Sequence, residues 1–388
     1  MPWLTDAAPE RAFGDFTKGE ATDANARRAN YAEAMDIPEH KFINNALSNR
    51  RQWSKQLLKL GVAIAASPLI ATAQTEKTKV QLVVDDVSSL VHLPLMLAQH
   101  LGYFKNEGLL VDIVEQAWNP GESNMSVGVT AWSVPFEQIL RANQKEMTWT
   151  SLVQTGRTPQ LALGINKKTM PVFKGLKDLE HKKIGVQALD SFAQHCADYI
   201  LLQAGISLSS VTYVPLGQSA NAIQSVRSGQ VDAICYSDPL ISFLEKKGDI
   251  GVVRNLRSMR DTSRVFSGLV PGHSLCVPAQ FTAKQPRTCQ ALVNGVMRAV
   301  KWLRTAGPSD LLHHMTDNSY MSDRAIYLHA VDNMRDSFTV DGLLTPDATA
   351  STLRLQRTLD AKMSIQRNFV AASHTNEFVF QAKKKFNI

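Results

Sequence analysis

The sequence predicts an α/β protein with two mostly parallel sheets, and two observations support this fold class. From Lys79 onward, β-rich runs alternate with apolar helical runs, which is the pattern of parallel strands covered by helices. Three of the predicted helices end at a glycine (Gly205, Gly229 and Gly248), and a new strand starts within a few residues of each. A single α/β domain is the alternative interpretation.

The first predicted unit is a strand at 79–85, a helix at 92–101 and a second strand at 109–115. Pro94 suits the first turn of this helix and Gly102 follows its last turn, an asymmetry typical of helices. A strand, helix and strand in this order predict parallel strands joined by a right-handed crossover.

The same alternation continues along the chain. Further strands are predicted at 126–130, 148–154, 160–166, 182–187, 210–215, 231–236, 250–256 and 274–281, and helices at 135–145, 191–205, 219–229, 239–248 and 285–307. Helical sequence fills most of the remainder to the C-terminus. Interruptions near 165–175 and 255–272 predict two chain crossings between two lobes.

Residues 49–73 have the composition of an export signal. Arg50 and Arg51 open a basic segment, an apolar run extends from Leu57 to Ile70, and Ala71-Thr72-Ala73 supplies small residues for cleavage. The run is shorter than the roughly 20 apolar residues that a membrane-spanning helix needs. The order NRRQWSK resembles a twin-arginine signal, with general secretion as the alternative route. The signal predicts a periplasmic protein.

Residues 1–48 precede this signal and form a polar leader extension, which we expect to be disordered and exclude from the fold. Met35 is an alternative start for the chain.

Composition excludes several function classes. The net charge of +7 is dispersed, without the Lys/Arg stripe and interleaved aromatics of a nucleic-acid site. The sequence contains no P-loop, no G-x-S-x-G and no H-E-x-x-H motif.

The four cysteines, Cys196, Cys235, Cys276 and Cys289, lack the spacing of zinc ligands. They are expected to form one or two disulfides or to be small buried side chains. We expect no metal and no cofactor.

Four stretches carry a family resemblance: GYFKNEGLLVDIVE (102–115), KDLEHKKIGVQ (177–187), SVRSGQVDAICYSDP (225–239) and HTNEFVFQA (374–382). Through them the chain resembles the periplasmic solute-binding proteins of ABC importers for nitrate, sulfonates, taurine and the pyrimidine precursor of thiamine. The resemblance covers nearly the whole chain after the signal. The GYFKNEGL run is the more specific signature, whereas SGQVDA occurs widely in bilobal binding proteins.

The resemblance implies a bilobal periplasmic binding protein (type II-like), with two parallel-sheet lobes joined by a hinge. Lobe 1 would comprise 74–168 plus 266–388, and lobe 2 would comprise 169–265. It also implies a monomeric, non-enzymatic receptor that closes on a small ligand and docks on an ABC permease. The chain departs from relatives at two places. Segment 119–130 is too short for the helix that relatives have there, and Asp190-Ser191 stands where relatives often have Gly-Ser.

Ligands of open parallel sheets bind beyond the carboxyl ends of the strands, close to helix N-termini. Polar side chains there can fix a small molecule, and aromatic side chains can form flat walls. This rule selects Asp86, Ser88, His92, Trp118, Thr130 and Trp132 from the first lobe. From the second lobe it selects Gln187, Asp190, Ser191, Phe192, Gln218, Ser219, Asn221, Tyr236, Ser237 and Asp238.

Each candidate also has a structural interpretation. Asp190, Ser191 and Asp238 are ordinary helix-capping residues, and Pro239 would then occupy a first helical turn. Trp118 and Trp132 are equally typical of a core or a lobe interface.

The acidic residues near the strand ends discriminate between ligands. An unscreened carboxylate a few ångströms from an anion costs roughly 1 kcal/mol even in water. Asp190, with Asp85, Asp86 and Asp238 at other strand ends, therefore favours a neutral or donor-bearing organic molecule, such as an aminopyrimidine, over nitrate or a simple sulfonate.

Two alternative functions remain open, a pyrimidine-synthesis-like enzyme of the same fold and a ligand sensor for a membrane signalling partner. The enzymes carry a cysteine-rich metal-binding run, and nothing comparable occurs in this sequence.

Overall fold

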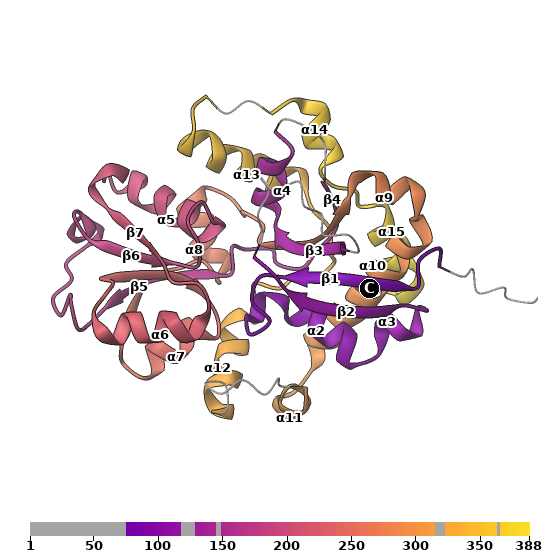
Figure 1. Ribbon diagram of the computed structural model, residues 1–388, viewed down its shortest axis with the longest axis horizontal. Helices are drawn as coiled ribbons and strands as arrows, with labels where there is room; N and C mark the ends of the chain where they lie inside the picture. Colours follow the sequence, from indigo (N-terminus) through magenta and orange to yellow (C-terminus); the bar gives the residue numbers. More distant parts are fainter. Residues whose placement is uncertain (1–74, 118–128, 145–148, 315–322, 363–364) are drawn as a thin grey trace, which may run out of the picture. The chain divides into compact units, whose positions relative to one another are not determined.

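The computed structural model describes residues 75–117, 129–144, 149–314, 323–362 and 365–388, without the side chains of residues 129 and 130 (Figure 1). All of these residues belong to one compact unit. The predicted leader extension and export signal, together with Trp118, lie outside the described residues.

The first sheet has the strand order β2-β1-β3-β10-β4 (Figure 1). Its strands are β1 (Lys79–Val84), β2 (Leu110–Glu115), β3 (Val129–Pro135), β4 (Trp149–Gln154) and β10 (His273–Pro278). β1 is parallel to β2 and β3, as the strand–helix–strand unit predicts, and α2 (Leu93–His100) with α3 (Tyr103–Asn106) connects β1 to β2. β10 runs antiparallel to both of its neighbours.

The second sheet has the order β7-β6-β8-β5-β9. Its strands are β5 (Leu161–Asn166), β6 (Lys183–Val186), β7 (Thr212–Pro215), β8 (Ala233–Ser237) and β9 (Ile250–Asn255). Helices α5 (Phe192–Gln203), α6 (Ser219–Ser228) and α7 (Leu240–Lys246) follow β6, β7 and β8, as predicted, and α8 (Met259–Phe266) follows β9. β6 is parallel to β7 and β8, whereas β5 is antiparallel to β8 and β9. The α/β class is confirmed, but each sheet is mixed.

Alternating side chains place apolar residues on both faces of each sheet. In β1, Leu82 and Val84 belong to a core that includes α10 (Pro286–Thr305) and α15 (Glu377–Phe386), whereas Val83 belongs to one with α4 (Phe136–Ala142). In β8, Cys235 packs with α5 and Ile234 packs with α6 and α7. Helices on both faces explain why the buried segments 82–84 of β1 and 233–235 of β8 are continuous apolar runs.

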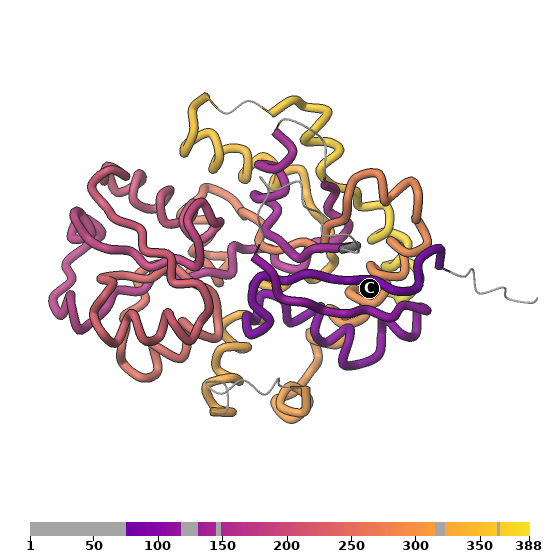
Figure 2. The backbone as a smooth tube through the Cα atoms, viewed as in Figure 1, coloured from indigo at the N-terminus to yellow at the C-terminus, as the bar shows by residue number. Residues whose placement is uncertain are grey.

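The remaining helices lie mostly in the last part of the chain. They are α9 (Ala279–Lys284), α11 (Pro308–His313), α12 (Arg324–Arg335), α13 (Pro346–Leu359) and α14 (Arg367–Ala372), with short 3-10 turns η1 (Leu90–His92), η2 (Leu176–Leu179) and η3 (Leu208–Ser210). Figure 2 shows that the part of the molecule around the first sheet combines early segments, in indigo and purple, with late ones, in orange to yellow. Leu355 of α13, however, packs in the core of the second sheet, and Asn333 of α12 donates a hydrogen bond to Ser242 of α7.

The chain crosses between the sheets at 155–160 and at 267–272. The predicted crossing near 165–175 is therefore displaced, because β5 already pairs in the second sheet, ahead of the predicted lobe boundary at 168. A strand's direction and partners are set by tertiary pairing, which local sequence does not reveal. The strand predicted at 126–130 is also displaced, because β3 extends to Pro135.

The two crossings contact each other through glycines. The amide of Gly272 donates to the carbonyl of Gly156 at 2.9 Å, and the amide of Gly156 donates to the carbonyl of His273 at 3.1 Å. A Cβ atom on Gly272 would lie 2.4 Å from the carbonyl oxygen of Thr158. The close approach of two backbones explains glycine at this position.

All four cysteines are unpaired and buried. Burial raises the pKa of each thiol, to about 12 for Cys235 and Cys289. The cysteines are therefore small buried side chains and form no disulfides.

No helix among the described residues has the length and apolar character needed to cross a membrane.

Replacing Gly272 by Ala should lower the free energy of unfolding by about 1–3 kcal/mol, because the backbone carbonyl it would meet cannot move cheaply. Urea denaturation measures this effect. Gly175→Ala is the matched control, since nothing lies within 4 Å of a Cβ atom there. Equal stability of the two variants would contradict the close contact between the crossings.

Candidate functional site

A cavity of about 810 Å³ is lined by residues from both sheets. Its polar lining comprises Asp85, Ser89, Glu115, Gln116 and Gln138 with Gln187, Asp190, Ser191, Gln218, Tyr236, Ser237 and His273. Its apolar lining includes Val91, Val134, Leu161, Leu189 and Phe192. The described lining contains no lysine and no arginine.

Strand direction explains why these residues meet. In the first sheet, Asp85 and Glu115 stand at the carboxyl ends of β1 and β2, and in the second, Gln187 and Ser237 stand at those of β6 and β8. The antiparallel strands begin at the same edges, so His273 at the start of β10 also reaches the cavity. Both sheets therefore present one edge to the same space.

Seven of the residues selected from the sequence line the cavity: Gln187, Asp190, Ser191, Phe192, Gln218, Tyr236 and Ser237. All seven come from the second sheet and its helix starts. Ser191 also caps α5, since its side chain accepts a hydrogen bond from the amide of Gln194. The hydroxyl of Tyr236 donates to the carbonyl of Gly217, which holds the ring at the cavity wall.

The other selected residues are absent from the described lining. Asn221 is exposed on α6, Trp132 is buried in the core, and for Thr130 the side chain is not described. Asp86 is buried and accepts hydrogen bonds from Ser88 and, across the two sheets, from Ser219 at 3.0 Å. Asp86, Ser88 and Ser219 therefore bond to one another rather than face the cavity.

Asp238 has a structural partner. Its carboxylate accepts a hydrogen bond from the amide of Ser242 in α7 and forms a 2.7 Å ion pair with Arg257, and both charged side chains are buried. Asp238 therefore has the structural role of the alternative interpretation, and its charge is compensated by a cation that the sequence did not indicate. The predicted positions differ by one residue, because Pro239 is the N-cap of α7 and the helix begins at Leu240.

Further hydrogen bonds join the two sheets around the cavity. The hydroxyls of Ser89 and Ser237 are 2.9 Å apart, the amide of Leu90 donates to the carbonyl of Asp238 at 2.8 Å, and Gln218 donates to Glu115. These bonds hold the two sheet edges together in a closed arrangement.

A partly buried network of charged side chains lies beside the cavity. His195 of α5 contacts Glu137 of α4 at 3.2 Å and Asp190 at 2.9 Å, and Arg141 of α4 reaches the same Asp190 oxygen at 2.9 Å. Burial opposes the imidazolium charge, but Glu137 and Asp190 outweigh burial and raise the pKa of His195 to about 9. The hydrogen bond from His195 keeps the pKa of Asp190 low.

Asp85, His92 and His273 form a second cluster in the cavity wall. Burial favours a higher pKa for Asp85, but the hydrogen bond and charge of His92 prevail and lower this pKa to about 2. His92 Nε2 lies 2.7 Å from Asp85, and His92 Nδ1 lies 2.9 Å from the hydroxyl of Ser133. Although Ser–His–Asp is the order of a hydrolase triad, Ser133 is buried and outside the described lining, whereas a nucleophile must reach its substrate.

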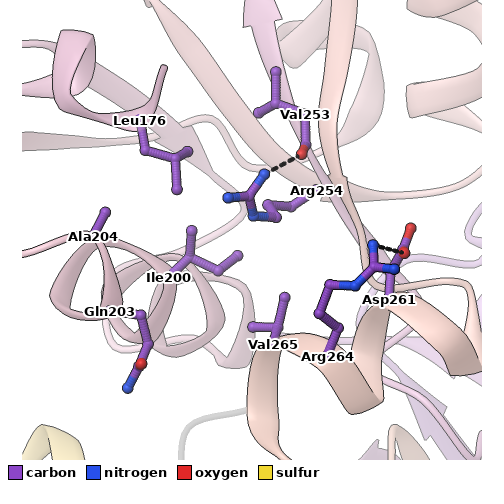
Figure 3. Close-up of a pocket in the computed structure, with 9 residues that line it drawn as sticks. All are labelled: Leu176, Ile200, Gln203, Ala204, Val253, Arg254, Asp261, Arg264 and Val265. Atoms are coloured by element: carbon purple, nitrogen blue, oxygen red, sulfur yellow. Dashed lines mark hydrogen bonds and ion pairs between the residues drawn. The ribbon is translucent and has the colours of Figure 1, made fainter.

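Another cavity, of about 410 Å³, lies wholly within the second-sheet part of the molecule. Its walls combine apolar side chains of α5 and α8, such as Ile200 and Val265, with Arg254 and Arg264 (Figure 3). Arg264 pairs with Asp261 at 3.5 Å, and Arg254 donates to the carbonyl of Val253. None of the residues selected from the sequence lines this cavity.

Sequence reasoning missed several lining residues, for two reasons. Glu115 ends β2 and Gln116 follows it directly, so the rule that selects polar residues at the carboxyl ends of strands could have found both. His273 stands at the start of a strand, where the rule does not look, and only the antiparallel direction of β10 brings it to the cavity. Gln138 reaches the cavity from a helix.

Comparisons with known proteins agree with this fold. The family model described as NMT1/THI5 like matches residues 89–306. A solved structure from Bordetella bronchiseptica RB50 is 32% identical with a TM-score of 0.76, over 81% of this chain and 100% of that chain. No curated protein matches the sequence.

Two more distant solved structures share the fold. The alkanesulfonate-binding protein SsuA from Xanthomonas axonopodis pv. citri, bound to MOPS, is 17% identical with a TM-score of 0.60, over 77% of this chain and 99% of that chain. The desulfurization enzyme DSZB is 16% identical with a TM-score of 0.55, over 79% of this chain and 99% of that chain.

The two mixed sheets and the cavity at their shared edges define an α/β protein with the periplasmic binding protein fold. Within that class, the chain belongs to the NMT1/THI5-like family. Solved structures that share the fold of this chain include periplasmic sulfonate-binding and nitrate-binding proteins.

Asp238→Ala should lower the free energy of unfolding by about 3–5 kcal/mol, because it leaves Arg257 buried without a counter-charge. Denaturant titration measures the loss. Asp336→Ala, in the more exposed pair with Arg157, is the matched control and should cost no more than about 1 kcal/mol. A folded Asp238→Ala protein of normal stability would show that this pair is not structural.

The raised pKa of His195 makes stability depend on pH. Its stabilising effect is fully present below the unfolded value near 6.5 and is lost as pH rises through about 9. One pKa unit corresponds to about 1.4 kcal/mol, so the loss of stability should be on the order of 1–3 kcal/mol. Glu137 and Asp190 raise the pKa of His195, Arg141 lowers it, and Asp198 also interacts with the imidazole charge. The urea midpoint of the wild type should fall as pH rises from 6 to 10, and the midpoint of His195→Gln should fall less. Equal dependence of the two midpoints on pH would contradict the stabilising role of the His195 charge.

Proposed function

We propose that the protein is a periplasmic receptor that binds a small organic solute and delivers it to an ABC importer, acting as a monomer and catalysing no reaction. The observation that carries the proposal is a single cavity to which both sheets contribute polar side chains, closed by hydrogen bonds between them. Its size falls within the range of small-molecule sites.

Two lobes and a hinge are part of this proposal. Each sheet has its own cores, and the glycine-containing crossings at 155–160 and 267–272 lie against each other. Lobe 1 would be the first-sheet part and lobe 2 the second-sheet part, including β5. Opening would break the bonds between Ser89 and Ser237 and between Asp86 and Ser219, and solute binding would supply compensating contacts.

Charge in the cavity favours a solute with hydrogen-bond donors. Three carboxylates line it, and Glu115 forms no ion pair among the described residues. Asp190 is compensated by Arg141 and His195, and the start of α5 presents backbone amides beside it. A neutral or donor-bearing molecule, with donors towards Glu115 and one acceptor towards α5, suits this arrangement better than nitrate or a simple sulfonate.

The enzyme alternative has one feature in its favour, the fold that the chain shares with a desulfurization enzyme. The buried thiols with raised pKa and the buried Ser133 hydroxyl are poor nucleophiles in this arrangement. Turnover of a candidate solute by the purified protein would favour the enzyme.

The other alternative is a receptor that reports the solute to a membrane signalling partner. A neighbouring histidine kinase gene would support this sensor function, whereas neighbouring permease and ATPase genes would support import.

Native mass spectrometry of the freshly purified full chain tests the receptor, because closed receptors retain their ligand. We expect a non-covalent adduct of one small organic molecule, lost on denaturation. Calorimetry should then show tighter binding of aminopyrimidines than of nitrate or alkanesulfonates. Tight binding of only sulfonates or oxyanions would overturn the solute class, and the absence of any small-molecule binding would overturn the receptor.

Gln187→Ala should weaken binding of that solute about tenfold or more, the effect of losing one hydrogen bond, without lowering the melting temperature. The side chain lines the cavity from the end of β6. Asn221→Ala is the matched control, because Asn221 is exposed on α6 and outside the described lining, so its affinity should not change. Calorimetry and thermal unfolding of both variants check the prediction, and equal affinities would contradict the cavity as the site.

A further inference from the structure

Three metal-binding side chains converge on the wall of the cavity. Asp85 follows β1, His92 ends η1 and His273 opens β10, and one donor atom from each lies within 4.8 Å of the other two. The rings of His92 and His273 are 5.0 Å apart between centroids and nearly perpendicular, at 85°. Two imidazoles and a carboxylate are a ligand set that divalent transition metals prefer.

His273 shows that this cluster is incomplete. Its side chain is only 6% exposed, yet neither ring nitrogen has a hydrogen-bond partner among the described residues. Buried polar groups without a partner are rare and costly, so they indicate an additional group such as an ion.

His92 already has the environment of a metal ligand. Its Nδ1 lies 2.9 Å from the hydroxyl of Ser133, and its Nε2 is hydrogen-bonded to Asp85 at 2.7 Å. A metal ion that replaces the Nε2 proton would leave Nδ1–H to donate to Ser133. An outer partner on the second ring nitrogen fixes the tautomer and orientation of metal-binding histidines in this way. Ser133 would be a positioning residue.

We propose that Asp85, His92 and His273 bind one divalent transition-metal ion of the zinc class, with a coordination position open to the cavity. Tetrahedral zinc spaces its ligand atoms about 3.3 Å apart, so small side-chain shifts bring the three donors into place. Asp85 and His273 line the cavity, which leaves the fourth position facing it. Water would occupy that position, or, if the proposed receptor function holds, a donor atom of the solute.

Titration of the full chain, freed of metal by a chelator, with Zn²⁺ alone tests the site. We expect one tight site by calorimetry, and Co²⁺ should give the visible spectrum of a four-coordinate ion. His273→Ala and Asp85→Asn should each weaken Zn²⁺ binding by about 100-fold or more, and Ser133→Ala by about 10–100-fold. Asp85 is only partly buried, so Asp85→Asn keeps the test valid if His273→Ala fails to fold.

The control is the double variant His313→Ala/His314→Ala. These adjacent histidines lie at the end of α11, with ring centroids 5.0 Å apart, and are another histidine pair able to bind zinc weakly. Their loss should leave the tight site unchanged. No tight Zn²⁺ binding, or binding that the control removes and Asp85→Asn does not, would overturn the metal site. Solute binding by the metal-free protein would still support the receptor, so the two proposals fail separately.

Discussion

The binding geometry depends on the shared direction of the strands at one edge of each sheet. Parallel strands end there, and one antiparallel strand in each sheet, β5 or β10, begins there. Because both crossings between the sheets run next to these antiparallel strands, the edges face each other across the cavity. The glycines at the crossings permit this, since a side chain at Gly272 would collide with the opposing backbone.

Electrostatic compensation divides the acidic residues into structural and available ones. Asp238 is buried against Arg257, and Asp86 is bonded to serines of both sheets, so neither is free to meet a solute. Asp85 and Glu115 line the cavity, where Asp85 is hydrogen-bonded to His92 and Glu115 accepts, among the described residues, only uncharged donors, the amide of Val87 and the side chain of Gln218. The number of acidic residues near strand ends therefore overstates the negative charge that a ligand meets, and the identity of each partner decides the rest.

Local sequence was enough to predict most strands and helices. Selecting polar and aromatic residues at the carboxyl ends of the predicted strands also found seven residues that line the cavity from the second sheet. It was not enough for the first sheet, where β3 extends to Pro135 and His273 enters from an antiparallel strand. Asp238 also forms an ion pair with Arg257, nineteen positions away, and only the folded chain shows that contact. Strand direction and long-range partners are tertiary properties, which periodicity does not encode.

The four buried thiols have a practical consequence. Since burial suppresses both their ionisation and their accessibility, a thiol-reactive dye should ignore the native protein and react only with molecules that have opened. Labelling then counts excursions from the folded state directly. Two of the four, Cys276 and Cys289, lie in cores of the first sheet, and Cys196 and Cys235 lie in a core of the second, so peptide mapping of the label distinguishes which half of the molecule opens first.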